Sequence, residues 1–247
     1  MTRIRISPAG VAFCLALATP SAAQLPSATQ IPVTEFAARR DSLAARVGDG
    51  VVVAFGGRTL VNDNGTFFQL PAFRYLTNFD EPDAALVMVV HAKKGASTLY
   101  LSPINARTAF YYGQRTDSAT SLRRTGIAGR PFSSLTATLD SLAKTGLTVF
   151  SLADFEDADF ARADSLTRGQ VFVKALAARH AGLVVRDAHP IVNELRARKS
   201  PAEIALLKKA ADISSEGHRA AMLTANPQHE YELRASLEYT FTKLGAE

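Results

Sequence analysis

The chain has 247 residues, of which 47% are hydrophobic and 21% are charged. This composition is that of a globular protein and excludes collagen-like, low-complexity and largely disordered chains. The formal net charge is only +5, and the basic residues lie in short pairs such as Arg39-Arg40 and Lys208-Lys209, so we expect no nucleic-acid partner. No apolar run reaches the roughly 18 residues of a membrane span.

The first 23 residues have the pattern of a secretory signal. Arg3 and Arg5 precede a short apolar stretch over residues 9–19, and the small residues Ser21-Ala22-Ala23 follow it. A basic start, an apolar stretch and an A-x-A-like site are typical of a cleaved signal peptide. We therefore expect cleavage after Ala23, a periplasmic or secreted location, and a flexible lead-in over residues 24–33.

Cysteine use is consistent with this interpretation. Cys14 is the only cysteine, and it follows the bulky Phe13 in the middle of the apolar stretch, where lipid attachment would require a small preceding residue. After cleavage the chain would contain no cysteine. We therefore expect no disulfide, no thiol nucleophile and no cysteine metal ligand in the mature protein.

Strands and helices alternate between residues 34 and 188. Thr34 can cap a helix that ends near Arg46, and the wholly apolar segment Val51–Phe55 predicts a strand buried on both faces. Further strands are expected at 84–90, 98–101, 148–151 and 183–185, a turn at 93–95, and helices at 133–144 and 167–179. The alternation predicts an α/β domain over 34–188, in which helices flank a mixed β-sheet.

A second unit is expected from residue 189 onward. Ser200, Pro201 and Glu203 form a helix start, with a cap, a first-turn proline and a capping-box glutamate. The apolar face of this helix is predicted to contain Ile204, Leu207, Ala211, Ser214, His218, Ala221 and Ala225. The next helix, at 230–244, has its apolar face at Leu233, Leu237, Phe241 and Leu244. Two such helices predict an incomplete domain, so we interpret 189–247 as the truncated start of a second domain.

Residue spacing alone gives little sign of catalytic chemistry. No Gly-x-Ser-x-Gly elbow or phosphate loop occurs, and an acidic cluster at 154–159 lacks the glycine and the bidentate glutamate of a calcium loop. The histidines have no partner at the i, i+4 spacing of a helical zinc site, and we interpret each as structural. They are His91, His180, His189, His218 and His229.

Two segments carry recognisable motifs. The first, residues 67–84, is similar to F-R-Q-x-x-D-F-x-Y-L-T-G-F-x-E-P-x-A, with matches at Phe67, Gln69, Phe73, Tyr75, Leu76, Thr77, Phe79, Glu81, Pro82 and Ala84. The second, residues 190–204, is similar to L-R-x-x-K-S-P-x-E-I, with matches at Leu195, Arg196, Lys199, Ser200, Pro201, Glu203 and Ile204. Both patterns resemble the Xaa-Pro aminopeptidase (aminopeptidase P) family. The departures are Phe68 for Arg, Ala72 for Asp, Asn78 for Gly and Gln228 for a frequent Gly.

The resemblance implies a creatinase-type N-terminal domain followed by the first helices of an α+β pita-bread catalytic domain. Family members bind two divalent metal ions, usually manganese, through two Asp, one His and two Glu. These ions activate a water that attacks the peptide bond before proline. The ligands lie beyond the position that corresponds to Glu247, so no catalytic, metal or substrate-binding residue is assigned to this chain. We expect peptides with proline at the second position as substrates of the full-length protein, and a homo-oligomer.

Two alternatives remain open for the function. A prolidase-type dipeptidase shares the fold, although the motif at 67–84 favours aminopeptidase P. A non-catalytic binding or oligomerisation module is the second alternative, because a histone-chaperone subunit uses the same two-domain fold without metals. The secretory signal argues against a nuclear role of that kind.

The signal peptide is directly testable. N-terminal sequencing of the protein from its native host should begin at Gln24 and give Gln-Leu-Pro-Ser, because the small residues at 21–23 suit signal peptidase. A cytoplasmic protein that retains Met1 would contradict this prediction.

Overall fold

The computed structural model describes residues 31–59, 67–103, 106, 109–110, 113–152, 168–224 and 229–246. The predicted signal peptide and the acidic cluster at 154–159 lie outside the described residues. The elements are α1 (Val33–Val47), β1 (Gly50–Phe55), α2 (Pro71–Thr77), β2 (Ala84–His91), β3 (Lys94–Leu101), α4 (Ser118–Thr125), β4 (Ala128–Pro131), η1 (Phe132–Ser134), α5 (Leu135–Ala143), β5 (Val149–Leu152), α6 (Arg168–Arg179), β6 (Val185–Asp187), α7 (His189–Ala197), α8 (Pro201–Met222) and α9 (Glu230–Lys243).

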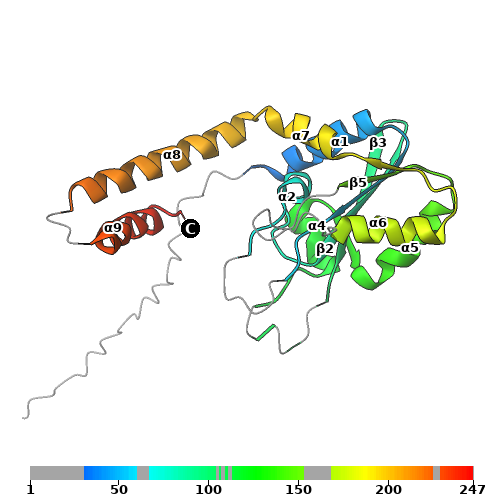
Figure 1. Cartoon of the computed structure of the whole chain (residues 1–247), viewed down its shortest axis with the longest axis horizontal. Coiled ribbons are helices and arrows are strands. Elements are labelled where there is room, and N and C mark those ends of the chain that lie inside the picture. Colours follow the sequence, from blue (N-terminus) through cyan, green and yellow to red (C-terminus); the bar gives the residue numbers. More distant parts are fainter. Residues whose placement is uncertain are drawn as a thin grey trace, which may run out of the picture.

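The strands form one mixed sheet in the order β4-β3-β2-β1-β5-β6 (Figure 1). Strands β1, β2 and β3 are antiparallel neighbours, so Val53 pairs with Val87 across β1 and β2. Strand β5 runs parallel to β1, β6 runs parallel to β5, and β4 runs parallel to β3. The predicted α/β fold with a mixed sheet and flanking helices is confirmed. We refer to this sheet with α1, α2 and α4–α7 as the sheet unit.

The hydrophobic core lies on both faces of the sheet. All of β1 is buried, and its residues alternate between the faces because successive strand side chains point to opposite sides. Val52 and Ala54 belong to one cluster, to which α1, α2 and α7 contribute Leu43, Phe73 and Val192. The second cluster contains Val51, Val53, Phe55, Leu135, Leu139 and Leu176, so α5 and α6 cover the other face.

The β2–β3 hairpin turns one residue earlier than the sequence predicts. Ala92 and Lys93 form the turn with φ values of 48° and 65°, and His91 pairs with Lys94. Asp49 supports the turn, because its Oδ1 accepts a hydrogen bond from the Ala92 N–H at 2.9 Å. Gly95 is instead part of β3, where a Cβ would lie 2.6 Å from the Met88 sulfur.

Several predicted helix boundaries differ from the structure. Helix α1 begins at Val33 after Pro32 and has no side-chain cap, so the prediction of Thr34 as the cap is wrong. A 3₁₀ turn precedes α5, which begins at Leu135. Helices α2 and α4 and strand β4 were not predicted, because they are short and their apolar residues have no clear period.

Helices α8 and α9 extend away from the sheet unit and pack side by side (Figure 1). The predicted capping box is confirmed, because the Ser200 hydroxyl accepts the Glu203 N–H and the Glu203 carboxylate accepts the Ser200 N–H. Gly217 permits the close approach of the helices, since a Cβ there would lie 2.2 Å from the Phe241 ring. Of the residues predicted on the apolar face of α8, Ile204, Leu207, Ala211 and His218 are exposed instead.

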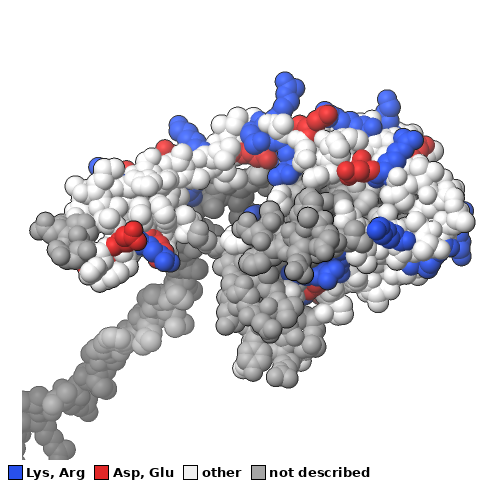
Figure 2. Space-filling model, in the orientation of Figure 1, with Lys and Arg blue, Asp and Glu red and all other residues white. Residues whose placement is uncertain are grey.

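The described residues on the face in Figure 2 do not form a dominant charged region. Among the described residues of the face in Figure 2, basic side chains lie singly or beside acidic ones, without a continuous basic stripe. Among all the residues that the structure describes, no helix is both long enough and apolar enough to cross a bilayer.

Two leucine substitutions test this core. Leu86 of β2 is fully buried, whereas Leu122 of α4 is 59% exposed. Leu86→Ala should lower the free energy of unfolding by about 2–5 kcal/mol, because it removes buried methyl groups and leaves a cavity. The matched variant Leu122→Ala should change it by no more than about 0.5 kcal/mol. Equal losses in urea denaturation would contradict the placement of β2 at the centre of the core.

Candidate functional site

The motif at 67–84, which we call the signature segment, is fixed to the end of β1 by Gln69. The buried Gln69 side chain accepts hydrogen bonds from the N–H groups of Gly57, at 2.7 Å, and Leu70, at 2.9 Å. Its amide nitrogen donates to the Glu81 carbonyl at 2.9 Å. One amide therefore satisfies backbone groups from three parts of the loop, which would otherwise be buried without partners.

Helix α2 forms the middle of the signature segment and packs its apolar residues into the core. Phe73, Leu76 and Phe79 are almost fully buried. The Thr77 hydroxyl donates to the Phe73 carbonyl at 2.8 Å and accepts the Phe79 N–H at 3.1 Å, so it ends the helix and turns the chain. These matching residues therefore act in folding and lie away from solvent.

The three departures in this segment have simple structural accounts. Asn78 has a φ of 53°, a left-handed conformation that asparagine adopts more readily than most residues. Ala72 is fully buried, so an aspartate at this position would require a buried partner. Phe68 is 79% exposed and contributes nothing to the core.

Glu81 joins the signature segment to the loop before α4. Its carboxylate accepts the Thr116 N–H at 2.8 Å and the Thr116 hydroxyl at 2.5 Å. Arg124 of α4 forms an ion pair with the same carboxylate. Pro82 follows, half-buried, and leads into β2. Glu81 is thus engaged in structural contacts from two elements.

Asp83 is a further acidic centre that the sequence did not reveal. It has a φ of 60°, and its carboxylate accepts hydrogen bonds from the N–H and hydroxyl of Thr59. Arg115 approaches it at 3.4 Å and Arg168 at 3.9 Å. The residues come from four separate parts of the chain, so no local pattern indicates that they meet.

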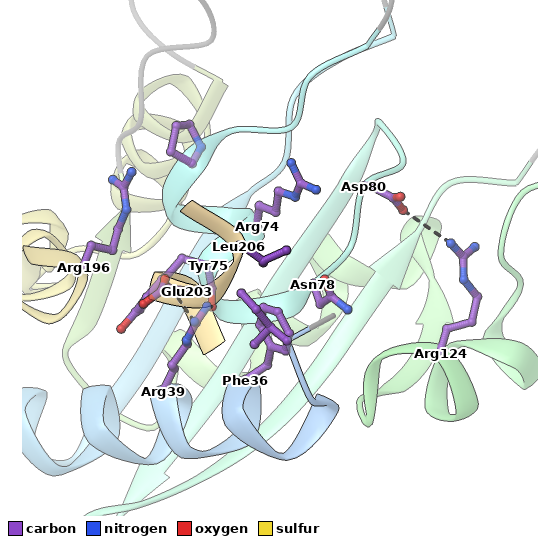
Figure 3. A pocket seen from close by; sticks show the side chains of 12 residues that line it. Phe36, Arg39, Arg74, Tyr75, Asn78, Asp80, Arg124, Arg196, Glu203 and Leu206 are labelled. Atoms are coloured by element: carbon purple, nitrogen blue, oxygen red, sulfur yellow. Dashed lines mark hydrogen bonds and ion pairs between the residues drawn. The ribbon is translucent and has the colours of Figure 1, made fainter. Parts of the chain in front are cut away.

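A groove of about 710 Å³ lies where α1, α2 and the first turns of α8 meet (Figure 3). We call it the junction groove. Its lining combines aromatic, basic and acidic side chains from α1, from α4, from the signature segment and from the motif at 190–204, which we call the linker motif. The lining residues are Ile31, Phe36, Arg39, Pro71, Arg74, Tyr75, Asn78, Asp80, Arg124, Arg196, Glu203 and Leu206.

Arg39 is the central residue of the junction groove. Its guanidinium carbon lies 4.2 Å from the centre of the Tyr75 ring and 4.8 Å from that of Phe36. Its Nη2 atom lies 2.5 Å from Glu35 and 3.1 Å from Glu203. Burial raises the pKa of Tyr75, and the positive charge of Arg39 opposes this shift. Burial therefore favours the neutral phenol of Tyr75 in this groove.

Arg40, the next residue, is also anchored to α2. Its Nη1 atom donates to the Leu76 carbonyl at 2.8 Å. Burial lowers the pKa of the Arg40 guanidinium, which nevertheless stays protonated because arginine is so strongly basic. The two consecutive arginines of α1 thus both hold α2 in place, since Arg39 also donates to the Tyr75 carbonyl at 3.3 Å.

The linker motif has mainly local contacts. Lys199 donates to the Arg196 carbonyl at 2.5 Å, and Arg196 reaches the Asn193 side chain at 3.4 Å. Pro201 occupies the first turn of α8, where its missing N–H costs nothing. The structure therefore brings Tyr75, Arg196 and Glu203 together at the junction groove. The other signature residues lie in the core, in the loop before β2 (Glu81 and Pro82) or at the start of α8.

The described residues do not provide a metal centre. Within the described ranges, no three His, Cys, Asp or Glu side chains lie close enough together to hold an ion. His180 contacts Asp140 at 2.9 Å, and this hydrogen bond is the main cause that lowers the pKa of Asp140. His91 lies 3.0 Å from Asp49 in the hairpin turn. A pair of metal ions therefore does not fit the described part of the chain.

Comparisons with known proteins point to one family. Residues 36–150 match the family model described as "Aminopeptidase P, N-terminal domain". The chain is 27% identical over 228 residues to the Xaa-Pro aminopeptidase of Escherichia coli, an alignment that covers 88% of this chain and 51% of that protein. It is 24% identical over 220 residues to the Xaa-Pro aminopeptidase of Haemophilus influenzae, covering 87% of this chain and 48% of that protein.

The solved structures agree with this similarity. A zinc-substituted Escherichia coli aminopeptidase P in complex with product superposes with a TM-score of 0.73 at 25% identity, covering 87% of this chain and 50% of that chain. The present chain thus spans about half the length of the curated relatives it matches, at 51% and 48%.

Neighbouring acids provide a test of the Glu81 contacts. The Glu81 side chain is 19% exposed and accepts from Thr116 and Arg124, whereas Asp80 is 62% exposed and lies 3.4 Å from the same arginine. Glu81→Gln should lower the free energy of unfolding by about 1–3 kcal/mol, because its charged hydrogen bonds are lost in a largely dehydrated site. The control Asp80→Asn should cost at most about 1 kcal/mol. Similar losses for both variants would show that the Glu81 network is not a structural centre.

Proposed function

The chain belongs to the aminopeptidase P family, and on this premise we propose that it is the N-terminal part of an exported Xaa-Pro aminopeptidase. The full-length protein would remove an N-terminal residue that precedes proline. The observation that carries this proposal is the match of residues 36–150 to the N-terminal domain of the family. Two curated relatives named Xaa-Pro aminopeptidase, aligned over 88% and 87% of this chain, support it.

The proposed domain division places the family's N-terminal domain at 34–188 and the start of the catalytic domain at 189–247. The extended arrangement of α8 and α9 away from the sheet supports a second unit, whereas α7, which this division assigns to the second domain, packs on the sheet (Figure 1). Helix α7 is the connecting element, because Val192 is buried in the same cluster as Leu43 of α1. The direction in which α8 leaves the sheet unit is therefore set at the end of α7 and at the junction groove.

Peptide hydrolysis would depend on residues outside the part of the chain that the structure describes. We propose that two divalent metal ions, manganese in the usual case, are held by a later part of the full-length protein, where they would supply an activated water. The described residues would act in placing that part. Arg39, Tyr75 and Glu203 form the contact at which the sheet unit meets α8.

Export and self-assembly complete the proposal. The basic and apolar start of the sequence supports passage to the periplasm or the exterior, with loss of the first 23 residues. There the enzyme would act on peptides with proline at the second position, as a homo-oligomer.

The activity test compares this chain with a longer protein. Purified residues 24–247 should release no first residue from a peptide that begins Arg-Pro-Pro, with or without added manganese, because a two-metal site needs several convergent carboxylates and an imidazole. A version that continues through the catalytic domain should cleave the same peptide. Release of the first residue is measured by chromatography.

Three results would overturn this proposal. Metal-dependent cleavage by residues 24–247 alone would show that the chain holds its own site. An inactive longer protein, whose coding sequence beyond Glu247 lacks the series Asp, Asp, His, Glu, Glu, would favour a non-catalytic binding module. Cleavage restricted to dipeptides would instead indicate a prolidase-type enzyme.

A further inference from the structure

The first turn of α8 is attached to the sheet unit through a buried arginine. Glu203, the third residue of α8, lies 3.1 Å from Arg39 of α1 across the junction groove (Figure 3). One residue and one turn further along α8, Ile204 and Leu207 are 55% and 57% exposed. The contact at the base of this helix therefore combines the Arg39–Glu203 ion pair with the single apolar side chain of Leu206, which lines the junction groove, and does not rest on a broad apolar interface.

We propose that Arg39 and Glu203 form an interdomain latch, a contact that fixes the direction of α8 relative to the sheet unit. Both are positioning residues in this proposal, and neither would touch a substrate. The latch itself is a feature of the fold. Its importance for catalysis rests on the proposed function, in which α8 belongs to the domain that carries the metal site.

Arg39 is oriented toward α8 by groups that belong entirely to the sheet unit. Glu35, one turn earlier on α1, binds the guanidinium at 2.5 Å, and the Tyr75 carbonyl accepts from it at 3.3 Å. The rings of Phe36 and Tyr75 contact the guanidinium at 4.8 and 4.2 Å. These contacts hold the planar guanidinium in one orientation, so it presents a preformed site for a second carboxylate.

Glu203 connects the latch to the direction of the helix axis. Its Oε2 atom accepts the Ser200 N–H at 2.9 Å, which closes the capping box, while its Oε1 atom faces Arg39. One carboxylate thus fixes the first turn of α8 and binds that turn to α1. The helix has 22 residues and is about 33 Å long, so a tilt of ~10° at its base would move its far end by roughly 6 Å.

The burial of the pair suits a role in orientation more than in stability. The Arg39 and Glu203 side chains are only 7% and 19% exposed, so solvent and salt screen their attraction weakly. Removing two charges from water is costly, and this cost offsets much of the attraction in a buried pair. The main contribution of the pair is therefore to the orientation of α8, because the fixed Arg39 guanidinium binds the Glu203 carboxylate in one position only.

The chain offers a pair of matched variants for the test. Glu203→Gln removes the charge that faces Arg39, but glutamine at this position still supports a capping box. Glu35→Gln removes the other carboxylate from the same guanidinium, within α1 and without crossing to α8. Both changes neutralise one acid on Arg39, and only the first breaks the contact with α8.

Double electron–electron resonance measures the direction of α8 in the mature chain, residues 24–247. Cys14 is the only cysteine, so the mature chain accepts spin labels at Lys94→Cys in β3 and Met222→Cys at the end of α8 without background. Both of these positions are exposed. The unaltered latch should give one narrow distance distribution, Glu203→Gln should broaden it at least twofold, and Glu35→Gln should leave it narrow.

The result that would overturn the latch is a Glu203→Gln distribution as narrow as that of the unaltered chain, or equal broadening by both variants. A broad distribution in the unaltered chain would overturn it as well. Far-UV circular dichroism confirms that α8 stays helical in each variant. Because no peptide cleavage is measured, failure of the latch is distinguishable from failure of the proposed function, which the Arg-Pro-Pro assay tests.

Discussion

All six residues of β1 are buried, so both faces of the sheet must be covered by helices. Val51, Val53 and Phe55 require α5 and α6 on one side, and Val52 and Ala54 require α1, α2 and α7 on the other. A strand of this kind lies at the centre of a sheet, where hydrophobic burial contributes most to folding. Because α7 is part of one covering layer, the chain that leaves for α8 is anchored in the core. The position of the junction groove follows from this arrangement.

The signature segment shows how a motif can be specific without being catalytic. Gln69, Thr77 and Glu81 each satisfy backbone N–H or carbonyl groups in a loop that runs beside buried strands. A buried backbone group without a partner costs about as much as a lost hydrogen bond, so each side chain must have the correct length and donor pattern. The resemblance at 67–84 therefore indicates a fold with a specific loop geometry. It gives no direct information on substrate chemistry.

The sequence predicted those features that depend on neighbouring residues. The buried strand at 51–55 follows from its unbroken apolar run, and the start of α8 follows from Ser200, Pro201 and Glu203. The cap at Thr34 was wrong because the helix begins one residue earlier, where Pro32 supplies an extended start. Helix α4 carries a capping box between Asp117 and Thr120, which is a local signal, but its short length gives too little periodicity to identify it. The contacts at Asp83 and the Arg39–Glu203 pair, whose residues are far apart in the sequence, follow only from the tertiary fold.

The charged contacts of Glu81 and Asp83 differ from those of Arg39 in where the partners come from. The partners of Glu81 and Asp83 lie within the sheet unit, so these contacts are made as soon as that unit folds. Arg39 differs, because Glu35 and Tyr75 come from the sheet unit and Glu203 comes from α8. The sheet unit can therefore fold with Arg39 already oriented by Glu35, and its remaining hydrogen-bonding capacity then selects one position of Glu203. The Arg39–Glu203 contact therefore makes the direction of α8 depend on the folded sheet unit. An apolar contact of the same area would fix that direction less specifically.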